Sequence, residues 1–188
     1  EELRQQGKQP YVVPYGGSNS VGALGFVAGM LELVAQEPGL VLTHIVFASS
    51  SGGTQAGLMV GGAQHGSGCQ IVGIKIDKAE LEGESFSEQV LELANQTAVK
   101  VGLERRFIES EVKLDGDYVG EGYGVVGELE REAITLLAQT EGILLDPVYT
   151  GRAFGGLIDG IRSGKFGKSD RILFWHTGGT PALFAYNR

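Results

Sequence analysis

Short apolar runs alternate with longer stretches of helical spacing along most of the chain. The runs that predict strands are Tyr11–Val13, Leu40–Phe47, Gln70–Ile76, Gly142–Leu145 and Arg171–Trp175. The stretches that predict helices are Val21–Gln36, Gln55–Gly66, Phe86–Gly102, Val126–Thr140, Arg152–Ser163 and a last one that opens near Pro181. Strands that alternate with helices are typical of a parallel sheet covered by helices. We therefore predict an α/β fold with an open, mostly parallel sheet and helices on both faces, in a three-layer αβα arrangement.

One segment, Val112–Gly124, interrupts this alternation. It contains Asp115-Gly116-Asp117 and three further glycines and has no helical period, which predicts an irregular loop or a short pair of strands. Long loops in compact domains often carry function, so Tyr123 within this segment is a candidate site residue.

The charge of the chain limits its partners. It carries 15 Lys and Arg against 23 Asp and Glu, a net charge of −8, which opposes a nucleic-acid duplex or an anionic membrane face as the main partner. No apolar run approaches the roughly 18 residues of a membrane span, and no secretory signal opens the chain. With a single cysteine, Cys69, and three scattered histidines, the chain has neither a disulfide pair nor zinc-like spacing. We expect a metal-free protein of the cytoplasm.

The most informative motif is Ser51-Gly52-Gly53-Thr54, here called the first glycine loop. It leads from an apolar strand directly into a helix of small residues, so free backbone N–H groups and a helix N-terminus converge on one point. The glycines allow close approach of the backbone, and the two hydroxyls add donors, which together favour a bound phosphate. A plain strand-to-helix turn capped by Ser or Thr is the alternative, and the motif alone leaves both interpretations open.

A second glycine loop runs from His176 to Pro181 and repeats this pattern after another predicted strand. Because ligands bind at the carboxyl ends of strands in open α/β sheets, we expect both loops to line one crevice, with Thr177 and Gly178 as pocket residues. The competing interpretation is a capping pair, Thr180-Pro181, beside a structural histidine.

Two further segments carry polar groups. Tyr149 and Thr150 follow Asp146-Pro147 at a predicted strand end, where a tyrosine hydroxyl can act as an acid, a base or an orienting donor, or the ring can simply fill space. The acidic run at residues 128–132 predicts a solvated helix face without chemistry.

Together these motifs resemble those of the pyridoxal-phosphate enzymes that include D-cysteine desulfhydrase and 1-aminocyclopropane-1-carboxylate deaminase, which are related to the tryptophan synthase β-subunit fold. The resemblance covers essentially the whole chain. The matching motifs, in chain order, are Pro14-Tyr-Gly-Gly-Ser-Asn-Ser, Ser51-Gly-Gly-Thr-Gln-Ala-Gly57, Gly122-Tyr123-Gly124, Leu145-Asp-Pro-Val-Tyr149-Thr150-Gly151 and His176-Thr-Gly-Gly179. It implies that residues 10–188 belong to the large, cofactor-binding domain and residues 1–9 to the end of a small domain.

The resemblance also implies roles. The first glycine loop is expected to hold the phosphate of pyridoxal 5'-phosphate, and Tyr123 and Tyr149 match the two active-site tyrosines of the family. Thr150 matches the position that contacts the pyridine nitrogen, which is a glutamate in the cyclopropane-opening deaminases. A neutral hydroxyl there is expected to leave the nitrogen less protonated, which suits β-elimination better than ring opening.

The implied reaction is conversion of D-cysteine to pyruvate, ammonia and sulfide, by loss of the α-proton and then of the β-thiol. 1-Aminocyclopropane-1-carboxylate deamination and L-cysteate sulfo-lyase activity, in which sulfite leaves, are the alternatives. The family resemblance further suggests a homodimer that acts on a small amino acid.

The resemblance leaves part of the enzyme unaccounted for. Family members are much longer, and the lysine that carries their cofactor lies in a part that precedes Glu1; no lysine of this chain matches its motif. Since the chain also starts without methionine, we expect a piece of a longer polypeptide that is inactive by itself. A non-catalytic module that binds a phosphate ligand is the alternative of another class. A nucleotide-binding enzyme is disfavoured because Walker and dinucleotide fingerprints are absent.

Overall fold

The sheet at the centre of the fold has four strands in the order β3-β2-β1-β4, and all neighbours pair in parallel. A computed structural model gives the structure of residues 1–77 and 85–186. The strands are β1 (His44–Ser49), β2 (Gln70–Lys75), β3 (Lys113–Asp115) and β4 (Ile172–Phe174). The α-helices are α1 (Glu2–Gln5), α2 (Leu24–Gln36), α3 (Gly53–Gln64), α4 (Phe86–Lys100), α5 (Glu128–Glu141) and α6 (Thr150–Arg162), and the short 3-10 helices are η1 (Tyr15–Gly17), η2 (Glu109–Glu111) and η3 (Thr180–Ala185).

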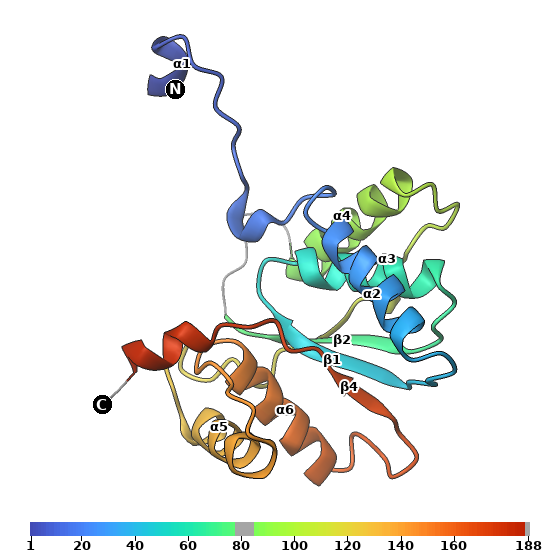
Figure 1. Ribbon diagram of the computed structural model, residues 1–188, viewed down its shortest axis with the longest axis vertical. Coiled ribbons are helices and arrows are strands. Elements are labelled where there is room, and N and C mark those ends of the chain that lie inside the picture. Colours follow the sequence, from blue (N-terminus) through green and yellow to red (C-terminus); the bar gives the residue numbers. More distant parts are fainter. Residues whose placement is uncertain (78–84, 187–188) are drawn as a thin grey trace.

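Helices cover both faces of this sheet. Helices α2, α3 and α4 lie on one face, and α5 and α6 lie on the other (Figure 1). Successive side chains of a strand point to opposite faces, so Ile45 and Phe47 of β1 pack in the core with the first group, while Val46 and Ala48 pack in the core with α6. The prediction of a three-layer αβα fold with a parallel sheet is therefore confirmed.

Helix α3 is the most deeply buried of the described helices, because it lies between the sheet and its neighbouring helices. Its small residues make this possible: a Cβ at Gly57 would lie 2.4 Å from the carbonyl oxygen of Ala23, so the backbones of the two segments approach too closely for any side chain. This packing fixes the start of α3, where the first glycine loop lies.

Three sequence-based predictions of secondary structure are wrong. The segment Tyr11–Val13 is exposed chain rather than a strand, and Gly142–Leu145 pairs with no strand among the described residues. Both are apolar runs without a neighbouring strand to supply backbone hydrogen bonds, which apolar composition alone cannot reveal. The third is the last predicted helix, which forms as the 3-10 helix η3. The segment Val112–Gly124 is largely irregular, as predicted, and contains the short strand β3.

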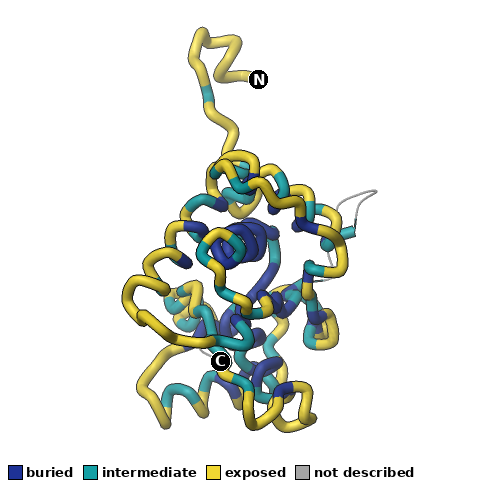
Figure 2. Tube along the Cα trace, turned by 90° about the vertical axis from the view of Figure 1, so that its right-hand side faces the viewer, coloured by how far each residue is buried: buried dark blue, intermediate teal, exposed yellow. Residues whose placement is uncertain are grey.

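Residues 1–13 project away from the body of the fold (Figure 1), and almost all of them are exposed (Figure 2). Helix α1 at their start buries no residue. The assignment of residues 1–9 to a separate small domain stays a prediction.

Candidate functional site

Both glycine loops lie at the carboxyl edge of the sheet. The first follows β1 and the second follows β4, and these two strands are parallel neighbours. The second loop packs against the segment before α6, since a Cβ at Gly179 would lie 2.7 Å from the Cγ of Asp146. The predicted location of both loops at one sheet edge is confirmed.

The first glycine loop has the shape of an anion cradle. Gly52 precedes α3 with φ of 84°, a left-handed conformation that favours glycine. The N–H of Gly53 donates to the hydroxyl of Ser18 at 3.1 Å, and that hydroxyl donates to Oγ of Ser51 at 2.7 Å. Within the described residues, no protein acceptor pairs with the N–H groups of Ser51, Gly52 or Thr54. The loop therefore fits a phosphate, which would accept from these donors at the positive end of α3.

A cavity of about 460 Å³ opens beside this loop. Ser51 lines it together with Ser50, whose hydroxyl donates to Asp77 at 3.1 Å, and with Tyr15 of η1. Helix η1 rests on the loop so closely that a Cβ at Gly16 would lie 2.2 Å from Oγ of Ser51. The volume is in the range of sites for small molecules.

Tyr123 and Tyr149 meet although they come from distant segments. Their hydroxyls are hydrogen-bonded to each other, and their rings lie 5.7 Å apart in an edge-to-face arrangement. Burial raises the pKa of Tyr149 above its ordinary range, and the hydrogen bond to Tyr123 raises it further. The charge of a nearby Tyr15 phenolate would act in the same direction. Tyr149 is protonated at neutral pH, as an ordinary phenol is, and the raised pKa extends this state to higher pH.

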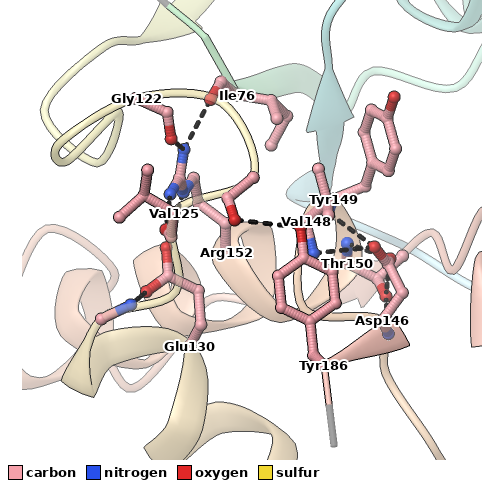
Figure 3. A network of polar contacts seen from close by, with 12 residues as sticks. Ile76, Gly122, Val125, Glu130, Asp146, Val148, Tyr149, Thr150, Arg152 and Tyr186 are labelled. Atoms are coloured by element: carbon pink, nitrogen blue, oxygen red, sulfur yellow. Dashed lines mark hydrogen bonds and ion pairs between the residues drawn. The ribbon is translucent and has the colours of Figure 1, made fainter. Parts of the chain in front are cut away.

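The start of α6 is fixed by Asp146, which is fully buried. Its carboxylate accepts four hydrogen bonds, from the N–H groups of Val148, Tyr149 and Thr150 and from the hydroxyl of Thr150 (Figure 3). The Thr150 hydroxyl in turn accepts from the N–H of Asp146 at 2.9 Å. Thr150 follows Tyr149 in the sequence, and its hydroxyl donates its proton to the carboxylate of Asp146.

The sequence did not predict that the guanidinium of Arg152 is buried; the residue is 1% exposed. Its Nε donates to Oε1 of Glu130 at 2.6 Å, its Nη1 to the carbonyls of Ile76 at 2.6 Å and Gly122 at 3.0 Å, and its Nη2 to the carbonyl of Val125 at 2.7 Å (Figure 3). One side chain therefore joins β2, α5, α6 and the segment that carries Tyr123.

The prediction of a solvated acidic face at residues 128–132 is wrong for Glu130, which is 4% exposed. Glu128 and Glu132 do face solvent, and the three carboxylates look alike in sequence. One feature of the sequence distinguishes Glu130: it lies in the first turn of a helix that begins after Gly127. A carboxylate at that position can accept a hydrogen bond from the backbone N–H before the helix.

The second glycine loop is held by His176. The Nδ1 of its ring accepts from the N–H of Gly178 at 3.0 Å, so Nε2 carries the proton and donates to the carbonyl of Leu144 at 3.1 Å. These contacts agree with a structural histidine. Thr177 is exposed, and Gly178 has φ of 94°; their roles as pocket residues stay predictions.

Neither a metal site nor a membrane span is found in the parts of the chain that the structure describes. No group of three or more His, Cys, Asp or Glu side chains there could hold a metal ion. No helix in residues 1–77 or 85–186 is both long and apolar enough to cross a bilayer.

Comparison with known proteins identifies the family. Residues 1–178 match the family model described as pyridoxal-phosphate dependent enzyme. The chain belongs to this family. Two curated relatives in it, both named D-cysteine desulfhydrase, come from Klebsiella pneumoniae (strain 342) and Klebsiella pneumoniae subsp. pneumoniae. Each is 46% identical over 187 residues, which cover 98% of this chain and 55% of the relative.

A solved structure of an ACC deaminase homologue has the same fold. It matches with a TM-score of 0.86 and 36% identity, over 98% of this chain and 54% of its own. The chain therefore spans about half the length of the relatives that it matches. The predicted family and its pyridoxal-phosphate dependence are confirmed by these matches.

Proposed function

We propose that this chain is the cofactor-binding part of a pyridoxal-phosphate dependent lyase that converts D-cysteine to pyruvate, ammonia and sulfide. The observation that carries the proposal is the first glycine loop, whose N–H groups at the start of α3 form an anion cradle at the carboxyl edge of the sheet, together with the paired hydroxyls of Tyr123 and Tyr149. The 46% identity to two D-cysteine desulfhydrases supports the choice of substrate.

The first glycine loop is assigned the cofactor phosphate. The N–H groups of Ser51, Gly52 and Thr54 and the hydroxyls of Ser51 and Thr54 are its donors, and the helix dipole of α3 adds to them. When bound, pyridoxal phosphate supplies an electron-withdrawing ring that stabilises negative charge at the α-carbon of an amino acid. The loop keeps that group at the carboxyl edge of the sheet.

The tyrosine pair is assigned to the substrate. The phenol of Tyr149 is protonated at neutral pH and can donate a hydrogen bond to an anionic substrate group, and its raised pKa makes it a weaker acid than a free phenol. Tyr123 is half-exposed and its hydroxyl is the partner of Tyr149, so it orients that phenol from the open side of the site.

Thr150 is assigned to the ring nitrogen of the cofactor. Thr150 is fully buried in this structure and donates its hydroxyl proton to the carboxylate of Asp146, so towards a ring nitrogen its oxygen could act only as an acceptor. A nitrogen paired with it would have to bring its own proton. The expectation that a neutral side chain leaves the nitrogen less protonated stays a prediction.

Three further assignments belong to the proposal. Residues 1–9 are the end of a small domain and residues 10–188 the large one, the protein acts in the cytoplasm, and it forms a homodimer. Sedimentation velocity of the protein from its natural source, together with fractionation of the cells that make it, tests the last two.

The test of the function uses the protein isolated from its natural source. It is incubated separately with D-cysteine, L-cysteate and 1-aminocyclopropane-1-carboxylate, and sulfide, sulfite and keto acid are measured. We expect sulfide and pyruvate from D-cysteine, with the other two substrates turned over more slowly. Faster turnover of L-cysteate or of 1-aminocyclopropane-1-carboxylate would contradict D-cysteine as the substrate. The latter compound is included because the solved relative is an ACC deaminase homologue.

The intact mass of the same sample, measured after borohydride reduction, provides the control. A covalent pyridoxyl-phosphate adduct is expected in an active protein. An adduct-free protein that binds pyridoxal phosphate and turns over none of the three substrates would contradict the lyase and favour the binding module.

A further inference from the structure

We propose that the buried ion pair of Arg152 and Glu130 is the positioning device for Tyr123, holding its loop in the place where the Tyr123 hydroxyl meets Tyr149. What the two tyrosines do for a substrate rests on the proposed function. The positioning itself is a property of this chain and can be measured without cofactor or substrate.

The loop that carries Tyr123 is held by its backbone. Tyr123 lies in an irregular segment and is 52% exposed, so its contact with Tyr149 leaves much of the side chain unpacked. The carbonyls of Gly122 and Val125, which flank it, both accept hydrogen bonds from Arg152, and the carbonyl of Gly124 accepts from the hydroxyl of Tyr186 at 2.9 Å.

Glu130 holds the other end of the same loop. Its Oε1 accepts from Arg152, and its Oε2 accepts from the N–H of Gly127 at 2.8 Å, where the loop enters α5. The pair therefore contacts the loop at Gly122, at Val125 and at Gly127. A third contact of Arg152, to the carbonyl of Ile76, ties this arrangement to the end of β2.

A guanidinium suits this task because its planar fork can donate to several carbonyls on different chain segments at once. Placing a charge in the interior is costly unless it is paired and hydrogen-bonded, and here Glu130 and the three carbonyls accept from four of the five N–H groups of the guanidinium.

The ion pair also determines how Tyr123 and Tyr149 lie relative to each other. Arg152 belongs to the first turn of α6, and Tyr149 is the residue immediately before that helix. The start of α6 thus carries one tyrosine directly and holds the loop of the other through Arg152. A displaced guanidinium would separate the two hydroxyls while leaving both side chains intact.

The test compares variants of the 188-residue chain. E130Q/R152M removes both charges while keeping side chains of similar size, and R152K keeps the charge but lacks the fork. R162M is the matched control, because Arg162 pairs with Glu132 across the same two helices at 2.7 Å but on the exposed surface. Amide hydrogen exchange is followed over residues 119–127. We expect exchange there to be faster by about ten-fold or more in E130Q/R152M, intermediate in R152K and unchanged in R162M.

A second readout follows the tyrosines themselves. With 3-fluorotyrosine in place of tyrosine, fluorine NMR signals are assigned through Y123F and Y149F. We expect the Tyr123 and Tyr149 signals to move in E130Q/R152M, to return most of the way in R152K, and to stay in place in R162M.

The proposal is overturned if E130Q/R152M folds and both readouts match the unsubstituted chain. If circular dichroism shows that this double variant does not fold, R152K decides. Selective loosening of residues 119–127 supports positioning, whereas an equal increase of exchange over α5, α6 and the loop assigns the pair a purely structural role and overturns the proposal. Because no pyridoxal phosphate or D-cysteine is present, these outcomes are independent of the lyase assay.

Discussion

Replacing Asp146 by Asn is the sharpest test of how the start of α6 is built. The substitution keeps the shape of the side chain and changes one carboxylate oxygen into an NH₂ group. In the native chain each oxygen of Asp146 accepts two hydrogen bonds: Oδ1 from the N–H and hydroxyl of Thr150, and Oδ2 from the N–H groups of Val148 and Tyr149. Whichever oxygen is replaced, two donors then face a donor.

The expected cost follows from these contacts. A hydrogen bond to a charged group contributes about 1.5–3 kcal/mol, and Asp146 is fully buried, so water cannot replace the lost acceptors. Two lost bonds give a decrease of about 3–6 kcal/mol in the free energy of unfolding, near the upper end of what single substitutions do. Rotation of the Thr150 hydroxyl away from the new NH₂ group would recover part of this loss.

Urea unfolding followed by circular dichroism measures the difference. Asp159→Asn is the matched control, since Asp159 lies on the same helix, is exposed and accepts a single hydrogen bond from Tyr118. Its cost is expected to stay below about 1 kcal/mol. A decrease below about 1 kcal/mol for Asp146→Asn would refute the argument that this carboxylate organises the turn before α6.

Other predictions concern packing, capping and titration. Gly57→Ala should lower the free energy of unfolding by about 1–3 kcal/mol or more, measured in urea, because its Cβ would meet backbone 2.4 Å away. Ser85→Ala, which removes the N-cap of α4, should cost about 1 kcal/mol in the same assay. The backbone N–H of Ser85 and, to a smaller extent, its hydroxyl lower the pKa of Glu88, so the stabilisation by Glu88 is present above its unfolded pKa and lost as the pH falls through its folded pKa. Ser85→Ala keeps the backbone donor and should therefore weaken this acid dependence only in part. Tyr123→Phe should lower the pKa of Tyr149 in an ultraviolet titration but leave it above the ordinary range, since burial is the larger cause.

Much of the fold could be predicted because both sheet faces are buried. The apolar runs that became β1, β2 and β4 are flanked by helices of clear period, and that pattern requires a covered parallel sheet. Residues 142–145 have the same composition as a strand, yet whether they pair depends on a neighbour that the local sequence does not contain.

The first glycine loop could be predicted because the backbone conformation there follows from the residue types. Glycines before a helix of small residues indicate an anion cradle wherever they occur, and the first glycine loop has this form. The buried pair of Arg152 and Glu130 was not predictable, because an arginine on a helix and a glutamate in an acidic run are usually solvated. Only the approach of segments from β2, α5 and α6 gives that guanidinium its partners.

Calorimetric binding of pyridoxal phosphate to this chain tests whether the first glycine loop holds the phosphate. Pyridoxal phosphate is compared with pyridoxal, which lacks the phosphate, for the unsubstituted chain, Gly52→Ala and Gly39→Ala. The two glycines have φ of 84° and 88°, so both substitutions place alanine in the left-handed region, and a Cβ at Gly52 also lies 3.2 Å from Cγ2 of Val90. Only Gly52 belongs to the loop. We expect that loss of the phosphate or Gly52→Ala weakens binding by about ten-fold or more, while Gly39→Ala leaves it unchanged. Equal affinity for the two ligands, or full affinity in Gly52→Ala, would contradict it.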